Sequence, residues 1–197
     1  QRLRAQHGAG FDALAASLLE PAPLDLRVNT LKASRDDLRL ALVHAGISST
    51  PTRWSPWGLR VQGKPSLVSL DAWKDGLFEI QDEGSQLLAW LVDARRGDMV
   101  ADFCAGGGGK TLALGASMAN TGRLYAIDTS ASRLAALAPR LARSGLSNVY
   151  TMAIDGERDP RLERLAGKMD RVLVDAPCTG LGTLRRHPAL TWRARER

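Results

Sequence analysis

The sequence has few cysteines, few aromatic residues and no long apolar run, and each scarcity excludes a class of protein. Two of its 197 residues are cysteine, Cys104 and Cys178, too few for a disulfide-rich secreted domain and without metal-ligand spacing. No window approaches the roughly 18 apolar residues of a membrane span. The first residues also lack the apolar core of a signal peptide. We therefore expect a cytoplasmic protein with no bound metal and no membrane partner.

The sequence also lacks an initiator methionine, because it begins with Gln1. This start indicates a chain that begins inside a longer protein. Its 27 basic and 21 acidic residues give a net charge of +6, and most of the basic residues are arginine. Such a balance favours a polyanionic partner such as nucleic acid, although arginine content also follows genomic base composition.

Residues 1–76 are predicted to form a small α+β domain. Residues 24–31 alternate apolar and polar side chains, which is typical of a half-buried strand. Ser34, followed by two aspartates, indicates a helix N-terminus, and Gly46 ends that helix. Residues 59–61 form a second candidate strand after a turn. Nothing in this region indicates catalysis.

Residues 77–197 alternate between strand and helix patterns. Short apolar runs predict strands at 99–103, 124–127, 149–154 and 171–174. The segments between these strands, and one segment before the first strand, show helical periodicity and are predicted to be helices. Pro139 interrupts one of these helical patterns. The alternation predicts an α/β fold, a Rossmann-like parallel sheet with helices on both faces. With so few strands before Arg197, we expect the sheet to be incomplete.

A glycine-rich loop follows the first of these strands. Gly106–Gly109 would let the backbone approach a ligand closely and turn its N–H groups toward it. A P-loop would need glycine where Cys104 stands, and a dinucleotide fingerprint would need glycine where Thr111 stands. These mismatches argue against a nicotinamide-dependent oxidoreductase. A strained turn without a ligand is the structural alternative.

Two aspartates end the next two predicted strands. Asp128 is placed where a carboxylate can bind both ribose hydroxyls of an adenosyl ligand, or where it stabilises a helix N-terminus. Asp155 can reach an adenine amino group from the same edge, or serve only the turn before Gly156. A sulfonium nucleoside such as S-adenosylmethionine fits this arrangement without requiring a pyrophosphate site.

The fourth predicted strand leads into Asp175, Pro177 and Cys178. Pyrimidine C5 is a poor nucleophile until a group adds to C6, and a thiolate is a good adding group. A neighbouring carboxylate can hydrogen-bond the cytosine edge as charge develops on the ring. The alternative is that Cys178 is a buried structural cysteine.

Taken together, four segments resemble the Sun-type (RsmB-like) RNA 5-methylcytosine methyltransferases. They occur in the family's order at residues 78–86, 104–111, 175–178 and 185–188. Residues 26–31 resemble that family's small N-terminal domain. The resemblance implies S-adenosylmethionine as cofactor and cytosine in RNA, specifically ribosomal RNA, as substrate. A pseudoenzyme that binds cofactor and RNA without turnover is the alternative.

The resemblance also implies roles for individual residues. Asp175 would lie between the methyl donor and the base, and Cys178 would release the methylated RNA. RNA would be contacted by Arg185, Arg186 and His187, and we expect a monomer. The residues expected to bind the cofactor are Cys104, Ala105, Gly106, Gly107, Gly108, Gly109, Lys110, Asp128, Arg133, Asp155 and Asp175.

The sequence departs from the family pattern in two places. The family usually has proline where Gly107 stands, so we expect a more flexible loop and weaker cofactor binding. The family's nucleophilic cysteine lies in a Thr-Cys motif on the next strand, and this sequence has no such motif. Cys104 belongs to the cofactor loop and cannot replace it. We therefore assign the activity to an intact parent protein and leave the activity of residues 1–197 alone open.

Overall fold

The computed structural model describes residues 2–178 and 180–186, which fall into two compact units. The larger unit comprises Leu24–Ala176, and the smaller one combines the segments before and after it. None of the helices in the described residues is long and apolar enough to cross a membrane.

The smaller unit joins the two ends of the chain through arginine side chains. Arg185 donates hydrogen bonds to the carbonyl oxygens of Glu20 and Pro21, both at 3.0 Å, and Arg186 donates to the carbonyl of Pro23. No residue of its two α-helices is buried, and the sequence prediction missed both, although apolar residues recur at helical spacing in α2 at Phe11, Leu14, Ala15, Leu18 and Leu19. The elements are α1 (Arg2–His7), η1 (Gly8–Gly10), α2 (Phe11–Leu19) and η3 (Leu181–Thr183).

The larger unit begins with an antiparallel sheet of strand order β2-β3-β1-β4. Its elements are β1 (Leu24–Val28), α3 (Arg35–His44), β2 (Ser49–Pro51), β3 (Gly58–Val61), α4 (Asp71–Lys74) and β4 (Phe78–Ile80). The helix α3 starts at the predicted Ser34, whose hydroxyl accepts from the Asp37 N–H while the Asp37 carboxylate accepts from the Ser34 N–H. Leu26, Leu38 and Phe78 form the core between the sheet and its helices. The predicted small α+β fold is therefore present.

The strand β4 lies beyond residue 76 yet pairs with β1, with Arg27 opposite Glu79. A boundary drawn between the two sheets therefore falls after Ile80. The division into domains at 1–76 and 77–197 stays a prediction.

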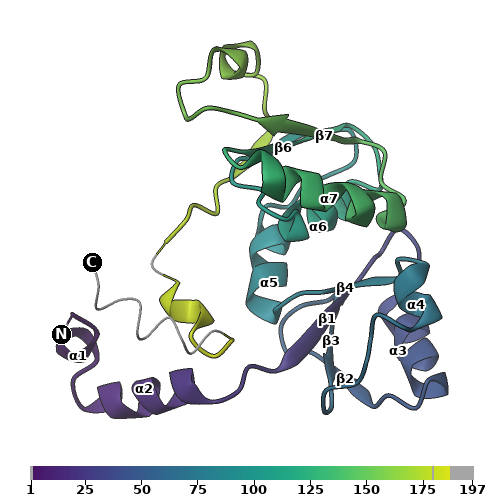
Figure 1. The fold of residues 1–197 in the computed structure, drawn as a ribbon, viewed down its shortest axis with the longest axis vertical. Coiled ribbons are helices and arrows are strands. Elements are labelled where there is room, and N and C mark those ends of the chain that lie inside the picture. The colour runs from purple at the N-terminus through teal and green to yellow at the C-terminus, as the bar shows by residue number, and fades with distance from the viewer. Residues whose placement is uncertain (1, 179, 187–197) are drawn as a thin grey trace. The chain divides into compact units, whose positions relative to one another are not determined.

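A second, parallel sheet follows, with the order β7-β6-β5-β8. Figure 1 labels two of its strands, β6 and β7. The parallel pairing of the sheet confirms the α/β prediction. The elements are α5 (Glu83–Leu91), β5 (Met99–Asp102), α6 (Gly109–Ser117), β6 (Arg123–Asp128), α7 (Ala131–Ser144), β7 (Val149–Ala153), η2 (Pro160–Arg164) and β8 (Arg171–Leu173).

The α-helices of this sheet cover one face only. Val100 and Leu124 pack with Leu114 of α6, whereas Ala101 and Ile127 on the opposite face pack with side chains in and after η2. Parallel crossovers are right-handed, so steps from β5 to β6 to β7 place their helices on one face, and the return to β8 crosses the other. That return carries a 3-10 helix. Within the described residues, the second face is thus covered by a short 3-10 helix rather than by an α-helix.

Asn29 and Lys32 connect the first sheet to the end of α7. The Asn29 amide donates to the carbonyls of Gly76 and Ser144, each at 2.9 Å, and is buried. The Lys32 ammonium donates to the carbonyls of Asp75 and Arg143, each at 2.7 Å. Helix C-termini leave carbonyls without intrahelical partners, and here the segment that follows β1 supplies those partners.

Candidate active site

A cavity of about 330 Å³ opens where β5 and β8 end. These strands lie side by side. The connection that follows β5 covers one face of the sheet and the connection that leads into β8 covers the other, and open α/β sheets bind ligands at such a switch point. One wall comes from the second sheet and its loops, and the other comes from the end of β4, the start of α5 and α7. The cavity is lined by Ile80, Gln81, Asp82, Ser85, Asp102, Cys104, Ala105, Gly107, Gly109, Lys110, Arg140 and Asp175.

The glycine loop is shaped by α7 on one side and Asp128 on the other. Gly108 has a φ of +80°, and a Cβ there would lie 2.1 Å from Cδ1 of Leu137, so only glycine fits. Gly106 also has a positive φ, of +54°, but a Cβ there would meet no atom within 4 Å. The loop therefore combines one glycine required by close packing with one that leaves open space.

Asp128 fixes the glycine loop through hydrogen bonds to backbone N–H groups. Its Oδ2 accepts from the Gly106 N–H at 2.8 Å and its Oδ1 accepts from the Ser130 N–H at 2.8 Å. The side chain is buried and does not line the cavity. Each carboxylate oxygen has a second lone pair for a ligand hydroxyl, so the ribose contact stays a prediction.

Two of the predicted cofactor residues are exposed and do not line the cavity. Arg133 is exposed, and its N–H donates to the Ser130 hydroxyl at the start of α7. Asp155 is exposed, and its N–H donates to the Asp159 carboxylate. Neither lines the cavity, and their cofactor roles stay predictions.

Lys110 and Asp175 both line the cavity and contact each other. The Lys110 Nζ lies 2.5 Å from Oδ2 of Asp175 in an ion pair, with Lys110 mostly buried and Asp175 half-exposed. Beside them the buried Asp102 carboxylate accepts a hydrogen bond from the Thr111 hydroxyl at 2.7 Å. Desolvation by burial raises the pKa of Asp102, and the Thr111 hydrogen bond opposes that shift. No sequence pattern pointed to a role for Asp102 or Thr111.

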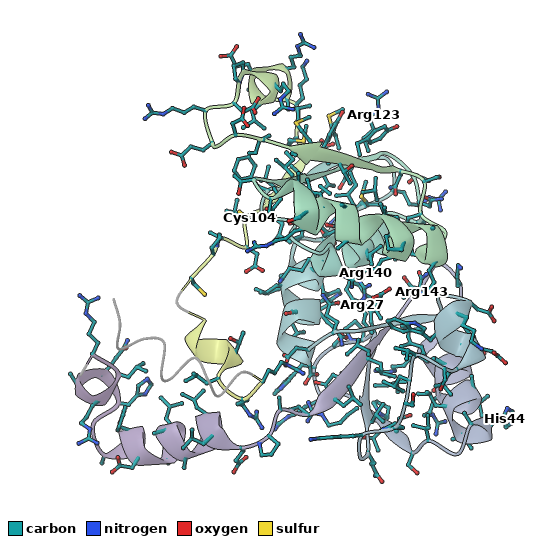
Figure 2. All side chains as sticks on the ribbon, viewed as in Figure 1. Arg27, His44, Cys104, Arg123, Arg140 and Arg143 are labelled. Atoms are coloured by element: carbon teal, nitrogen blue, oxygen red, sulfur yellow. The ribbon has the colours of Figure 1, made fainter. Side chains whose placement is uncertain are left out.

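The two cysteines have different surroundings. Cys104 lines the cavity, and burial together with the carboxylates of Asp128 and Asp102 raises the pKa of its thiol (Figure 2). A raised pKa keeps the thiol protonated at neutral pH, which is unfavourable for a nucleophile. Cys178 belongs to the smaller unit and is exposed.

The predicted RNA-binding arginines have partners in the smaller unit. Arg185 and Arg186 hydrogen-bond the backbone carbonyls described above. His187 lies outside the described residues. The RNA-binding roles of all three stay predictions.

Three polar side chains from the segment that follows β4 also line the cavity: Gln81, Asp82 and Ser85. The segment at 78–86 carried part of the family resemblance, but no ligand role was assigned to it. Gln81 is buried, and its Oε1 has no hydrogen-bond partner among the described residues. Arg140 also lines the cavity, and no sequence pattern pointed to it. Within the described part of the chain, no group of three His, Cys, Asp or Glu side chains could hold a metal.

Comparison with protein families agrees with this geometry. The family model described as 16S rRNA methyltransferase RsmB/F matches residues 89–197. The chain belongs to the RsmB/F methyltransferase family. The ferredoxin-like domain of RsmF/B-like methyltransferases matches residues 1–67. The resemblance to the Sun-type family is confirmed.

Relatives in this family cover most of the chain. A probable ribosomal RNA small subunit methyltransferase B from Synechocystis is 34% identical over 94% of this chain and 42% of its own length. A human 28S rRNA (cytosine(4447)-C(5))-methyltransferase is 36% identical over 86% of this chain and 21% of its own length. The chain thus spans less than half the length of these relatives.

A solved structure shows the same fold. The crystal structure of a methyltransferase homolog protein from Pyrococcus horikoshii has a TM-score of 0.81 and 31% sequence identity to this chain. The match covers 93% of this chain and 62% of that one. The predicted Rossmann-like methyltransferase fold with a small α+β domain is therefore confirmed.

Proposed function

We propose that this chain supplies the cofactor site of an S-adenosylmethionine-dependent methyltransferase that acts on C5 of cytosine in ribosomal RNA. The observation that carries the proposal is the cavity where β5 and β8 end, lined by both the glycine loop and Asp175. The names of the two relatives described above support methyl transfer to rRNA, and one of them names the C5 position.

The residues present fit this cofactor. The loop offers open space above Gly106, and Lys110 supplies a cation for the carboxylate of the methionine end. Asp128 offers its remaining lone pairs to the ribose, and Asp155 stays the candidate for the adenine. When bound, the cofactor supplies the methyl group.

Asp175 is proposed to act on the target base. It is half-exposed and held by Lys110 at the cavity wall, so its second carboxylate oxygen is available for a cytosine edge. Cys178 is proposed to serve product release, and Arg185, Arg186 and His187 to contact RNA. The protonated Cys104 is not proposed as the nucleophile. We propose that the protein acts as a monomer in the cytoplasm.

Methyl incorporation tests this proposal. The native protein, purified from its source, is given S-adenosylmethionine with a labelled methyl group and ribosomal RNA that lacks the modification. We expect label at C5 of cytosine, a large loss with Asp175→Asn, and no loss with Asp71→Asn, a matched change at an exposed residue of α4. Absence of label with the native protein, despite binding of S-adenosylhomocysteine, would favour the pseudoenzyme. Preferential binding of NAD would favour an oxidoreductase.

A further inference from the structure

Three arginines surround the buried carboxylate of Glu79 between the first sheet and α7. Glu79 accepts from Nη2 of Arg140 at 2.8 Å and also from Arg143. Arg27 lies directly opposite Glu79 on β1. Figure 2 labels the three arginines, which lie close together where α7 meets the first sheet.

Arg140 differs from the other two arginines because it also reaches the glycine loop. Its Nη1 donates to the carbonyl oxygen of Gly107, while its Nε and Nη2 donate to Glu79. The guanidinium is a rigid planar fork, so fixing two of its nitrogens on Glu79 also fixes the direction of the third. The same side chain lines the cavity.

The loop has a physical need for such a restraint. Consecutive glycines have the largest backbone freedom in a flexible chain, and ordering them costs conformational entropy. A Cβ at Gly107 would lie 3.5 Å from Nη1 of Arg140, an ordinary contact, so the guanidinium lies directly over that residue.

We propose that Arg140 is a positioning residue that holds the glycine loop in the conformation that binds the cofactor, and that Glu79 of the first sheet holds Arg140. The effect on cofactor rests on the function proposed above, whereas the restraint on the loop does not. The first sheet thereby takes part in the cofactor site through its carboxylate.

Charge makes Arg140 suitable for a substitution test. Burial lowers the pKa of Arg27 to about 10, and its Nε and Nη1 have no hydrogen-bond partner among the described residues. Three cations therefore surround one carboxylate, and removing Arg140 leaves Glu79 bonded to Arg143 and facing Arg27. The folded protein is expected to tolerate the loss.

Hydrogen exchange of the ligand-free protein measures the restraint. In Arg140→Ala we expect the backbone amides of residues 105–110 to exchange about 2- to 12-fold faster, the factor for one net hydrogen bond. Arg140→Lys should show the same increase, because an ammonium lacks the fork that spans Glu79 and Gly107. The matched control is Arg143→Ala, which loses a Glu79 bond but no loop bond. Amides of β6 should be unchanged in Arg140→Ala.

Calorimetric measurement of S-adenosylhomocysteine binding completes the test. The dissociation constant should rise by a similar factor in both Arg140 variants and stay unchanged in Arg143→Ala. In turnover, KM for the cofactor should rise while kcat stays the same. Equal loop exchange in Arg140→Ala and the unsubstituted protein overturns the proposal. If the unsubstituted protein fails to bind, the proposed function is lost, while the exchange data still decide the restraint.

Discussion

The Lys110 ammonium lies 2.5 Å from the Asp175 carboxylate, and this ion pair joins the start of α6 to the segment after β8. It brings a cation of the glycine loop next to the carboxylate that we propose acts on the target base. Substitution of Lys110 should therefore affect cofactor binding, whereas substitution of Asp175 should affect methyl transfer.

Lys110→Met is expected to weaken binding of S-adenosylhomocysteine by about 10- to 150-fold, the range for losing a hydrogen bond to a charged group. Asp175→Asn should bind nearly as well but slow methyl transfer by about 10²- to 10⁴-fold, as for loss of an acid–base group. Calorimetry and single-turnover transfer measure the two effects. Equal loss of binding in both variants would contradict the division of roles.

Asp128→Ala removes the acceptor of the Gly106 N–H along with the proposed ribose partner. We expect cofactor binding to weaken by about 1–3 kcal/mol, the range for a charged hydrogen bond. Titration with S-adenosylhomocysteine measures the change. An unchanged dissociation constant would refute the ribose assignment, and Asp71→Ala at an exposed position of α4 serves as the control.

Gly108→Ala and Gly106→Ala form a matched pair, because both positions have positive φ but only Gly108 is crowded by Leu137. Gly106→Ala should cost about 1–2 kcal/mol of the free energy of unfolding, from backbone strain alone. Gly108→Ala should cost about 1–3 kcal/mol more, from overpacking. Urea denaturation gives both values, and equal costs would show that the loop moves away from α7.

The raised pKa of Asp102 should make the free energy of unfolding depend on pH. Its pKa is raised in the folded protein, so the folded state retains a proton that the unfolded state releases above about pH 4. The contribution of Asp102 is fully present below that pH and is lost as pH rises through the folded pKa. Asp102→Asn should therefore gain stability relative to the unsubstituted protein as pH increases.

Thr111→Val should raise the Asp102 pKa further, because it removes the hydrogen bond that favours the ionised form. The pH range over which stability falls should then extend to higher pH. Denaturation curves between about pH 4.5 and 8 measure this, with Thr50→Val on β2 as the control. A pH profile identical to that of the unsubstituted protein would mean that Asp102 does not titrate in this range.

Elements with local patterns could be predicted from the sequence. The strands of the parallel sheet are short apolar runs, and α3 carries its capping residues within a few positions of one another. The helix α7 continues through Pro139 because Leu134 and Leu137 are buried, so packing outweighs the local penalty. In contrast, β2 and β4 have three residues each, too few for an alternating pattern to register.

The candidate site was only partly predictable, because some of its contacts join residues that are far apart in the sequence. The glycine loop and Asp175 have motifs, whereas the contacts of Arg140 with Glu79 and Gly107 join positions far apart in the sequence. Such contacts leave no local periodicity or spacing. Asp128 was identified by its place after a strand, but its hydrogen bond to the loop backbone required the structure.

The bonds that Asn29 and Lys32 make to the end of α7 limit how this protein can be recombined. A Cβ at Gly76 would lie 2.0 Å from the Arg143 carbonyl oxygen, so the two surfaces meet with no spare room. A chimera whose grafted first sheet brought no counterparts of Asn29 and Lys32 would leave those carbonyls without donors. The last turn of α7 would then have to be transferred together with the first sheet, as a single unit.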